Sequence, residues 1–130
     1  VKGALGYVEY AYVKKNNMTF LQLQNADGKY VSPDDATFAA AAASADWFSV
    51  PGMGISMVNA KGANSWPVST ASFILMYKDP ADKAQSAEVL KFFDWAFKNG
   101  KGMAAELDYV PLPDSLTAEI RSKVWSQIKK

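Results

Sequence analysis

The sequence contains no cysteine and no histidine, and these two absences exclude several kinds of chemistry. Without cysteine there is neither a disulfide framework nor a thiolate nucleophile. Without histidine the chain lacks the usual general base, the commonest zinc ligand and every Ser-His or Cys-His nucleophilic pair. An enzyme would have to use carboxylates, lysine or tyrosine, and Glu9, Asp27 and Asp46 show no motif relationship. We therefore expect a protein that is not an enzyme and uses no cofactor or metal.

Long hydrophobic runs and a large excess of one charge are missing as well. No apolar run approaches the length of a membrane span. The sequence has fourteen basic and thirteen acidic residues, so it is nearly neutral. The basic residues do not alternate with aromatic residues along a stripe, and nucleic acid is therefore not an expected partner. With 49% hydrophobic and 21% charged residues, the 130 positions are typical of a globular chain with one core.

The chain is organised around the apolar run Phe73–Tyr77, which follows Trp66-Pro67 and precedes a long amphipathic segment. An unbroken apolar run between polar residues predicts a strand buried on both faces, as in a sheet that helices cover. Such a strand needs neighbours, and no other run in the sequence has the same character. Either this chain or further polypeptide must therefore supply the missing strands.

The first third of the chain predicts short strands and one helix. We expect Gly3–Val8 to lead into a short strand. Glu9–Asn17 could continue that strand or form a short helix that stops at Asn16-Asn17, and we favour a strand that passes into a helical turn. A hairpin should join Thr19–Gln24 to Lys29–Val31 through a turn at Ala26-Asp27-Gly28. Tyrosines 7, 10 and 12 could form a stacking platform for a sugar or base, although packing on a neighbouring element is the commoner role of such residues.

Four segments carry helical signals. In the segment 32–45, Ser32 is the expected N-cap, Pro33 is expected at the first helical position, and the Asp35 side chain is expected to reach back to the cap. After the segment 80–98, Gly100 is suited to the left-handed conformation that ends a helix. Between these two, residues 48–65 are irregular, and the polar, flexible segment Lys61–Ser65 marks a boundary. The element order predicts the α/β class. The helical segments cover residues 32–45, 80–98, 103–107 and 114–128.

Several stretches together resemble one protein family, the PstS periplasmic phosphate-binding proteins that feed a phosphate ABC transporter. The resemblance covers all 130 residues in the same order, and it matches the C-terminal part of that family alone. The stretches that carry it are Gly6–Tyr12, Ala45–Trp47, Trp66–Thr70, Phe73–Leu75, Glu88–Ala96 and Leu107–Ser115.

The resemblance implies the C-terminal part of a two-lobed periplasmic-binding-protein fold of type II, the Venus-flytrap fold. Residues 1–62 would end the second lobe, residues 63–68 would form the interlobe crossover, and residues 69–130 would return to the first lobe. Trp66 and Pro67 would then act as the hinge. The upstream part of the same polypeptide would supply the missing strands.

The resemblance also implies a function, namely a solute receptor that binds inorganic phosphate in the interlobe cleft and delivers it to the membrane permease of an ABC transporter. Such a receptor is periplasmic, or extracellular and tethered to a membrane. The family's ligand motifs, including an arginine followed closely by Ser-Gly-Thr, have no counterpart here, where Arg121 is the one arginine. No ligand-binding residue is therefore assigned, and the phosphate ligands are expected upstream of Val1. A free-standing α/β interaction module and a binding protein for another small anion remain as alternatives.

Overall fold

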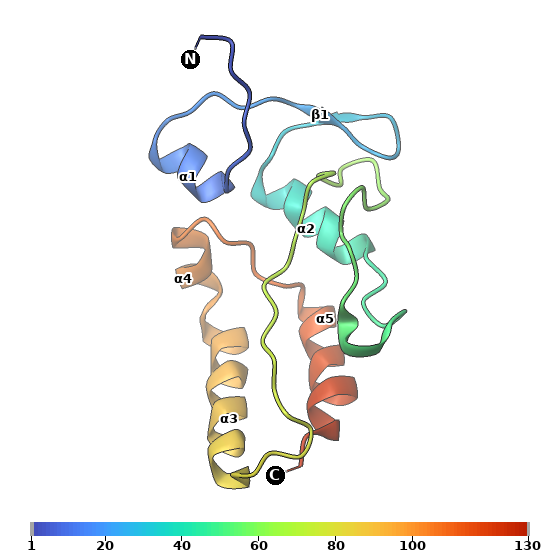
Figure 1. Cartoon of the computed structure of the whole chain (residues 1–130), viewed down its shortest axis with the longest axis vertical. Helices are drawn as coiled ribbons and strands as arrows, with labels where there is room; N and C mark the ends of the chain where they lie inside the picture. Colours follow the sequence, from blue (N-terminus) through green and yellow to red (C-terminus); the bar gives the residue numbers. More distant parts are fainter. Residues whose placement is uncertain (1, 130) are drawn as a thin grey trace.

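The structure is a computed structural model that describes residues 2–129, and these residues form a helix-rich piece with one two-stranded sheet (Figure 1). The N-terminus and the C-terminus lie at opposite ends of its long axis. Within the described residues, no helix combines the length and the apolar character needed to cross a membrane. The elements are α1 (Tyr10–Lys15), β1 (Leu23–Gln24), β2 (Tyr30–Val31), α2 (Asp35–Ser44), η1 (Pro51–Met53), α3 (Lys83–Asn99), α4 (Lys101–Glu106), α5 (Asp114–Glu119), η2 (Ile120–Val124) and η3 (Trp125–Gln127).

The N-terminal segment differs from the prediction. Gly3–Val8 pairs with no other described segment, and Tyr7 is fully exposed, so the short strand expected after this lead does not form. Within Glu9–Asn17, residues Tyr10–Lys15 form the helix α1, so the short helix is confirmed and the favoured strand followed by a helical turn is wrong. The chain leaves this helix through Asn17, whose φ is +49°. Asparagine is one of the few residues that adopt this left-handed conformation readily, which explains the predicted stop at this position.

The predicted hairpin is confirmed, although its strands are short. Leu23 pairs with Val31 and Gln24 with Tyr30 in antiparallel register. The turn between them includes Gly28 at φ +74°, a conformation that favours glycine. Val31 is buried and Leu23 half-buried, so one face of the hairpin turns inward.

Helix α2 begins later than predicted, because Asp34 and not Ser32 is its N-cap. The Asp34 carboxylate accepts from the Thr37 backbone N–H over 2.8 Å, and the Thr37 hydroxyl oxygen accepts from the Asp34 N–H over 3.1 Å. This reciprocal capping box satisfies two helix-end donors at once. The Ser32 carbonyl accepts from the Thr37 hydroxyl over 2.8 Å, so Ser32 supports the cap without being it.

The apolar run Phe73–Tyr77 does not form the buried strand that its composition predicts. It is extended and pairs with no other described segment, and Leu75 is 92% exposed. In Figure 1 it belongs to the long yellow-green segment that runs between α3 and α5. A strand exists only when a neighbour pairs with its backbone, and the described part of this chain offers none.

Helix α3 confirms the predicted amphipathic helix with changes at both ends. Its first residue is Lys83, three residues after the start of the predicted segment 80–98. Asp82 is the N-cap, and its carboxylate accepts from the Gln85 N–H over 2.8 Å. Gly100 has φ −85°, so the predicted left-handed conformation is wrong. Glycine is still required, because a Cβ at this position would lie 2.6 Å from the Ala96 carbonyl oxygen. This close approach lets α4 follow α3 directly.

The buried core lies where the end of α2 meets α5. The Trp47 indole N–H donates to the Ala42 carbonyl over 2.8 Å, which satisfies its one polar group inside the core. Leu116 and Ile128 are buried, whereas Ile120 and Val124, which lie between them in the segment predicted as one helix, are half-buried. The core therefore draws on residues from both sides of Trp66-Pro67. Its buried members are Ala42, Trp47, Met57 and Leu116.

Candidate functional site

Trp66 and Pro67, the predicted hinge residues, are both buried in the structure. The Trp66 N–H donates to the Thr37 carbonyl over 3.0 Å, and the Trp66 ring makes an edge-to-face contact with Phe38 at 6.2 Å between centroids. The Pro67 carbonyl accepts from the Asn59 N–H over 2.7 Å. These contacts attach the two residues to α2 and to the irregular segment before them.

The segment after Pro67 is held less firmly than the segment before it. The Ser69 hydroxyl donates to the Trp66 carbonyl over 3.2 Å, and this hydrogen bond is buried. Val68 and the run Phe73–Tyr77 are largely exposed. The chain thus changes at Trp66-Pro67 from a hydrogen-bonded loop to an extended, weakly covered segment.

Arg121, the one arginine, contacts one acidic, one hydroxyl and two aromatic side chains. Its Nε–H donates to Asp94 Oδ1 over 2.7 Å, and a terminal nitrogen donates to the Thr117 hydroxyl over 3.4 Å. The guanidinium also lies over the rings of Phe97 and Trp125, 5.7 and 5.9 Å from their centroids. The hydrogen bonds from Lys98 and then from Arg121 lower the pKa of Asp94. Arg121 therefore connects α3 to the C-terminal helix and is not presented to a ligand.

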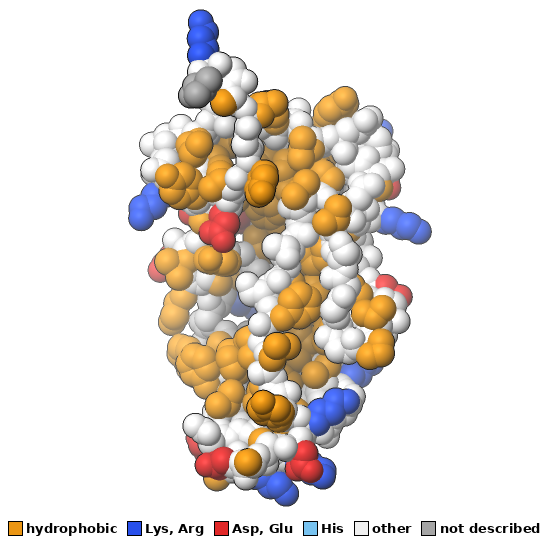
Figure 2. Space-filling view, in the orientation of Figure 1, with side chains coloured by type: hydrophobic (Ala, Val, Ile, Leu, Met, Phe, Trp, Pro, Cys, Tyr) orange, Lys and Arg blue, Asp and Glu red, His pale blue; other side chains and the backbone are white. Residues whose placement is uncertain are grey.

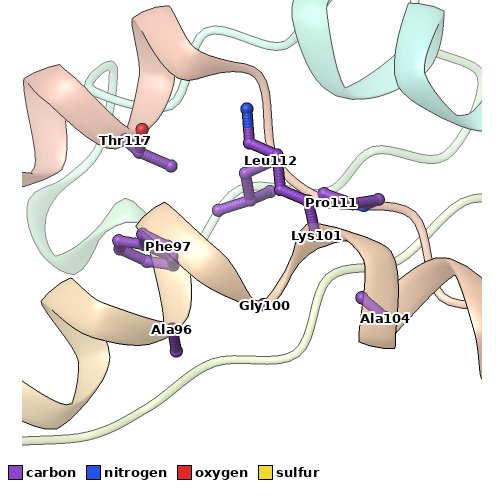
Figure 3. A pocket seen from close by; sticks show the side chains of 8 residues that line it. All are labelled: Ala96, Phe97, Gly100, Lys101, Ala104, Pro111, Leu112 and Thr117. Carbon is purple, nitrogen blue, oxygen red and sulfur yellow. The ribbon is translucent and has the colours of Figure 1, made fainter.

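Figure 3 shows the cavity formed where α3, α4 and α5 meet, with a volume of about 240 Å³. Its one charged lining residue is Lys101, whose ammonium donates to the Asp114 carboxylate over 2.5 Å. An oxyanion out of water needs several convergent donors, and this cavity offers little beyond apolar groups. It is therefore a poor phosphate site. Its lining residues are Ala96, Phe97, Gly100, Lys101, Ala104, Pro111, Leu112 and Thr117.

The tyrosines near the N-terminus do not form a stacking platform. Tyr10 packs edge to face against Phe20 at 6.1 Å and against Phe38 at 5.4 Å, so packing on neighbouring elements is confirmed for this residue. Tyr7 and Tyr12 are exposed. Across residues 2–129 no group of three or more acidic, histidine or cysteine side chains could hold a metal ion.

Comparison with known proteins identifies relatives over nearly the whole chain. No model of a protein family matches it. It is 46% identical over 129 residues to the phosphate-binding protein PstS of Pasteurella multocida, covering 99% of this chain and 38% of that relative. It is 43% identical over 130 residues to the PstS of Haemophilus influenzae, covering 100% and 39%. It is 44% identical over 129 residues to the PstS of Xylella fastidiosa, covering 99% and 35%.

These relatives confirm the resemblance on which the sequence analysis relied, and all three are named as binding proteins. The chain is much shorter than they are, and it spans between a third and two fifths of their length. By sequence the chain is therefore similar to the PstS phosphate-binding proteins over a stretch equal to 35–39% of their length.

Proposed function

We propose that this chain is the C-terminal part of a receptor that binds inorganic phosphate between two lobes and passes it to the permease of an ABC transporter. The observation that carries the proposal is the 43–46% identity to proteins named PstS, which extends over essentially every residue of the chain. The receptor is a binding protein and not an enzyme, and it uses no cofactor. As in the family, its place is the periplasm, or the outer face of a membrane to which it is tethered.

Within this receptor the chain supplies scaffold and crossover. Residues 1–62 end the second lobe, residues 63–68 cross between the lobes, and residues 69–130 complete the first lobe. The phosphate ligands lie upstream of Val1. The engagement of Arg121 by Asp94 supports this assignment, because it leaves the part of the chain that the structure describes without an arginine presented to an oxyanion.

The exposed apolar surface supports the view that further polypeptide packs against this chain. Figure 2 shows hydrophobic side chains spread over much of the visible face. Leu75 and Tyr77 are 92% and 83% exposed, and Phe92 and Trp95 of α3 are also exposed. Burying a large apolar side chain is worth roughly 1.5 to 3 kcal/mol, so covering four of them is worth about 6 to 12 kcal/mol, which is comparable to the roughly 5 to 15 kcal/mol net stability of a domain. The natural occupant of this surface is the remainder of the same polypeptide.

The proposal is tested by titrating the complete polypeptide with phosphate, sulfate and a panel of sugars in an isothermal calorimeter. Phosphate should give saturable one-site binding, and sulfate and the sugars should give none. Discrimination of this kind arises when a buried acceptor faces an oxyanion that has no proton to donate. Saturable binding of sulfate or a sugar with no response to phosphate would reject phosphate as the ligand.

A further inference from the structure

Asn25 is a buried polar residue at the tip of the hairpin, with 5% of its surface exposed. Its side-chain oxygen accepts from the Asp27 N–H over 3.1 Å and from the Lys29 N–H over 3.0 Å. Both bonds lie within its own turn. The oxygen therefore shapes the hairpin, and this half of the amide has a local explanation.

The other half of the Asn25 amide points out of the hairpin. Its nitrogen lies 3.1 Å from the Gly62 carbonyl, 2.9 Å from the Ala63 carbonyl and 3.3 Å from the Ser65 carbonyl. These acceptors are 37 to 40 residues away along the chain. One side chain thus fastens the hairpin to the loop that leads into Trp66.

That loop is compact, although its composition predicts a flexible segment. The Ser65 side chain is almost fully buried, and its hydroxyl donates to the Lys61 carbonyl over 2.7 Å. The Ser65 N–H donates to the Gly62 carbonyl over 2.9 Å. Gly62 has φ +118°, and a Cβ there would lie 2.9 Å from the Ser65 hydroxyl oxygen. The loop therefore has a defined shape that presents three carbonyl oxygens to Asn25.

We infer that Asn25 is a positioning residue that fixes the start of the interlobe crossover, and this inference rests on the proposed phosphate receptor. The next residue after the loop, Trp66, is bonded to Thr37 of α2. Asn25 and Thr37 therefore hold the chain on both sides of the step from Ser65 to Trp66. A crossover held in this way limits the open conformations that a two-lobed receptor samples. When the crossover is loosened, a smaller fraction of the receptor molecules is in the conformation that binds ligand, and the apparent ligand affinity weakens in proportion.

The substitution Asn25→Asp separates the two functions of this side chain. A carboxylate keeps the acceptor that serves the Asp27 and Lys29 amides, so the hairpin retains its turn. It loses the donor, however, and turns a negative oxygen toward three carbonyl oxygens. The matched control is Gln24→Glu, the same change of amide to carboxylate on the neighbouring exposed residue, whose side chain donates within the hairpin to the Gly28 carbonyl.

The test compares both variants with the unchanged protein, each as the complete polypeptide. Hydrogen exchange of the Trp66 amide, followed by NMR without phosphate, should be about 10-fold faster in Asn25→Asp, because buried carbonyls lose their donor. The phosphate Kd should rise by about 3- to 10-fold in the same variant. Gln24→Glu should leave both quantities unchanged. If Asn25→Asp fails to fold, Asn25→Ser is measured in its place. Serine keeps a shorter hydrogen-bonding group, so its effects on Trp66 exchange and on the phosphate Kd should have the same sign and be smaller.

A pH series adds a readout that lost packing alone would not give. Once the carboxyl introduced by Asn25→Asp is protonated, it can donate a hydrogen bond again. At each pH, the exchange rate of the Trp66 amide in Asn25→Asp is compared with its rate in Gln24→Glu. The faster exchange of Asn25→Asp should disappear as pH falls from about 7 to about 4. Unchanged Trp66 exchange in Asn25→Asp would overturn the inference, and so would faster exchange with an unchanged phosphate Kd. Failure of the unchanged protein to bind phosphate would instead overturn the proposed function.

Discussion

The guanidinium Nε of Arg121 lies 2.7 Å from Asp94 Oδ1, while the ammonium of Lys98 lies 2.5 Å from Oδ2 of the same carboxylate. One half-exposed carboxylate therefore receives two cations, one from its own helix and one from the C-terminal helix. Arg121 gains further contacts from the aromatic rings of Phe97 and Trp125, which stack at 5.5 Å. This cluster joins α3 to η2 and η3.

Removing either cation should raise the pKa of Asp94. The hydrogen bond from Lys98 is the larger cause of the lowered pKa and that from Arg121 the second, so Lys98→Met should raise it more than Arg121→Met. Carboxyl-carbon NMR titration of Asp94 in the complete polypeptide measures the effect. Because the pKa in the folded state lies below the ordinary value of 3.8, the cluster stabilises the fold above that pH. This contribution is lost as pH falls through the lower folded-state pKa.

The control for this titration is Lys91→Met, which removes a lysine of the same helix that pairs with Glu88. It should leave the pKa of Asp94 unchanged. A larger effect from Arg121→Met than from Lys98→Met, or equal effects from all three variants, would contradict the assignment of causes.

Lys14→Met should lower the thermal midpoint of the complete polypeptide by about 1 to 3 °C at pH 8, because it removes the link from α1 to Asp108. The hydrogen bond to Asp108 raises the pKa of Lys14 above its ordinary 10.5. The link is therefore fully present below pH 10.5 and is lost as pH rises through the folded-state pKa. The gap in thermal midpoint between Lys14→Met and the unchanged protein should therefore close as pH rises from 10.5 through the folded-state pKa of Lys14. Lys15→Met, at the neighbouring exposed position, should show no such closing gap.

Pro67→Gly should weaken phosphate binding while the protein stays folded. Glycine increases the freedom of a chain position that proline restricts. Residues that absorb hinge rotation lie in loops or at the ends of elements, and Pro67 lies in the irregular segment between η1 and α3. The comparison is Pro51→Gly, an exposed proline at the start of η1. Calorimetric titration should give a phosphate Kd about 2- to 5-fold higher for Pro67→Gly alone. An unchanged Kd would indicate that Trp66-Pro67 is not a hinge and that the core shared by Trp47 and Leu116 holds the two segments together.

Leu116→Ala should destabilise the protein by about 2 to 5 kcal/mol, the usual cost of a cavity at a buried leucine. Leu116 is 6% exposed and belongs to the one core that joins α2 to α5. Leu107→Ala is the control, since Leu107 is largely exposed. Urea denaturation of the complete polypeptide followed by far-ultraviolet circular dichroism separates the two. Equal destabilisation by both variants would show that further polypeptide buries Leu107.

Local signals in the sequence predicted the hairpin and helix α3, but not the conformation of the N-terminal segment. The hairpin follows from alternation around Ala26-Asp27-Gly28, and α3 follows from the spacing of Leu90, Phe93 and Phe97. Helix ends were less accurate, because Ser32 and Asp34 are both good caps and the choice depended on Thr37, which completes a capping box with Asp34 alone.

Signals that depend on distant partners failed. Phe73–Tyr77 has the composition of a buried strand, but composition does not supply the neighbour that a strand needs, and the described residues leave it unpaired. The role of Asn25 could not be predicted either, since its acceptors lie 37 or more residues away and the loop that carries them resembles a flexible linker. Both depend on which segments meet in space.

The most direct test of the account is scanning calorimetry of residues 1–130 and of the complete polypeptide, each with and without phosphate. The isolated segment should show no sharp transition and no response to phosphate, because its apolar surface is uncovered and the ligands are elsewhere. The complete polypeptide should unfold cooperatively and gain about 2.7 kcal/mol of stability at a phosphate concentration 100 times Kd. A sharp transition of the isolated segment that moves up with phosphate, or a complete polypeptide that does not respond to phosphate, would contradict the account.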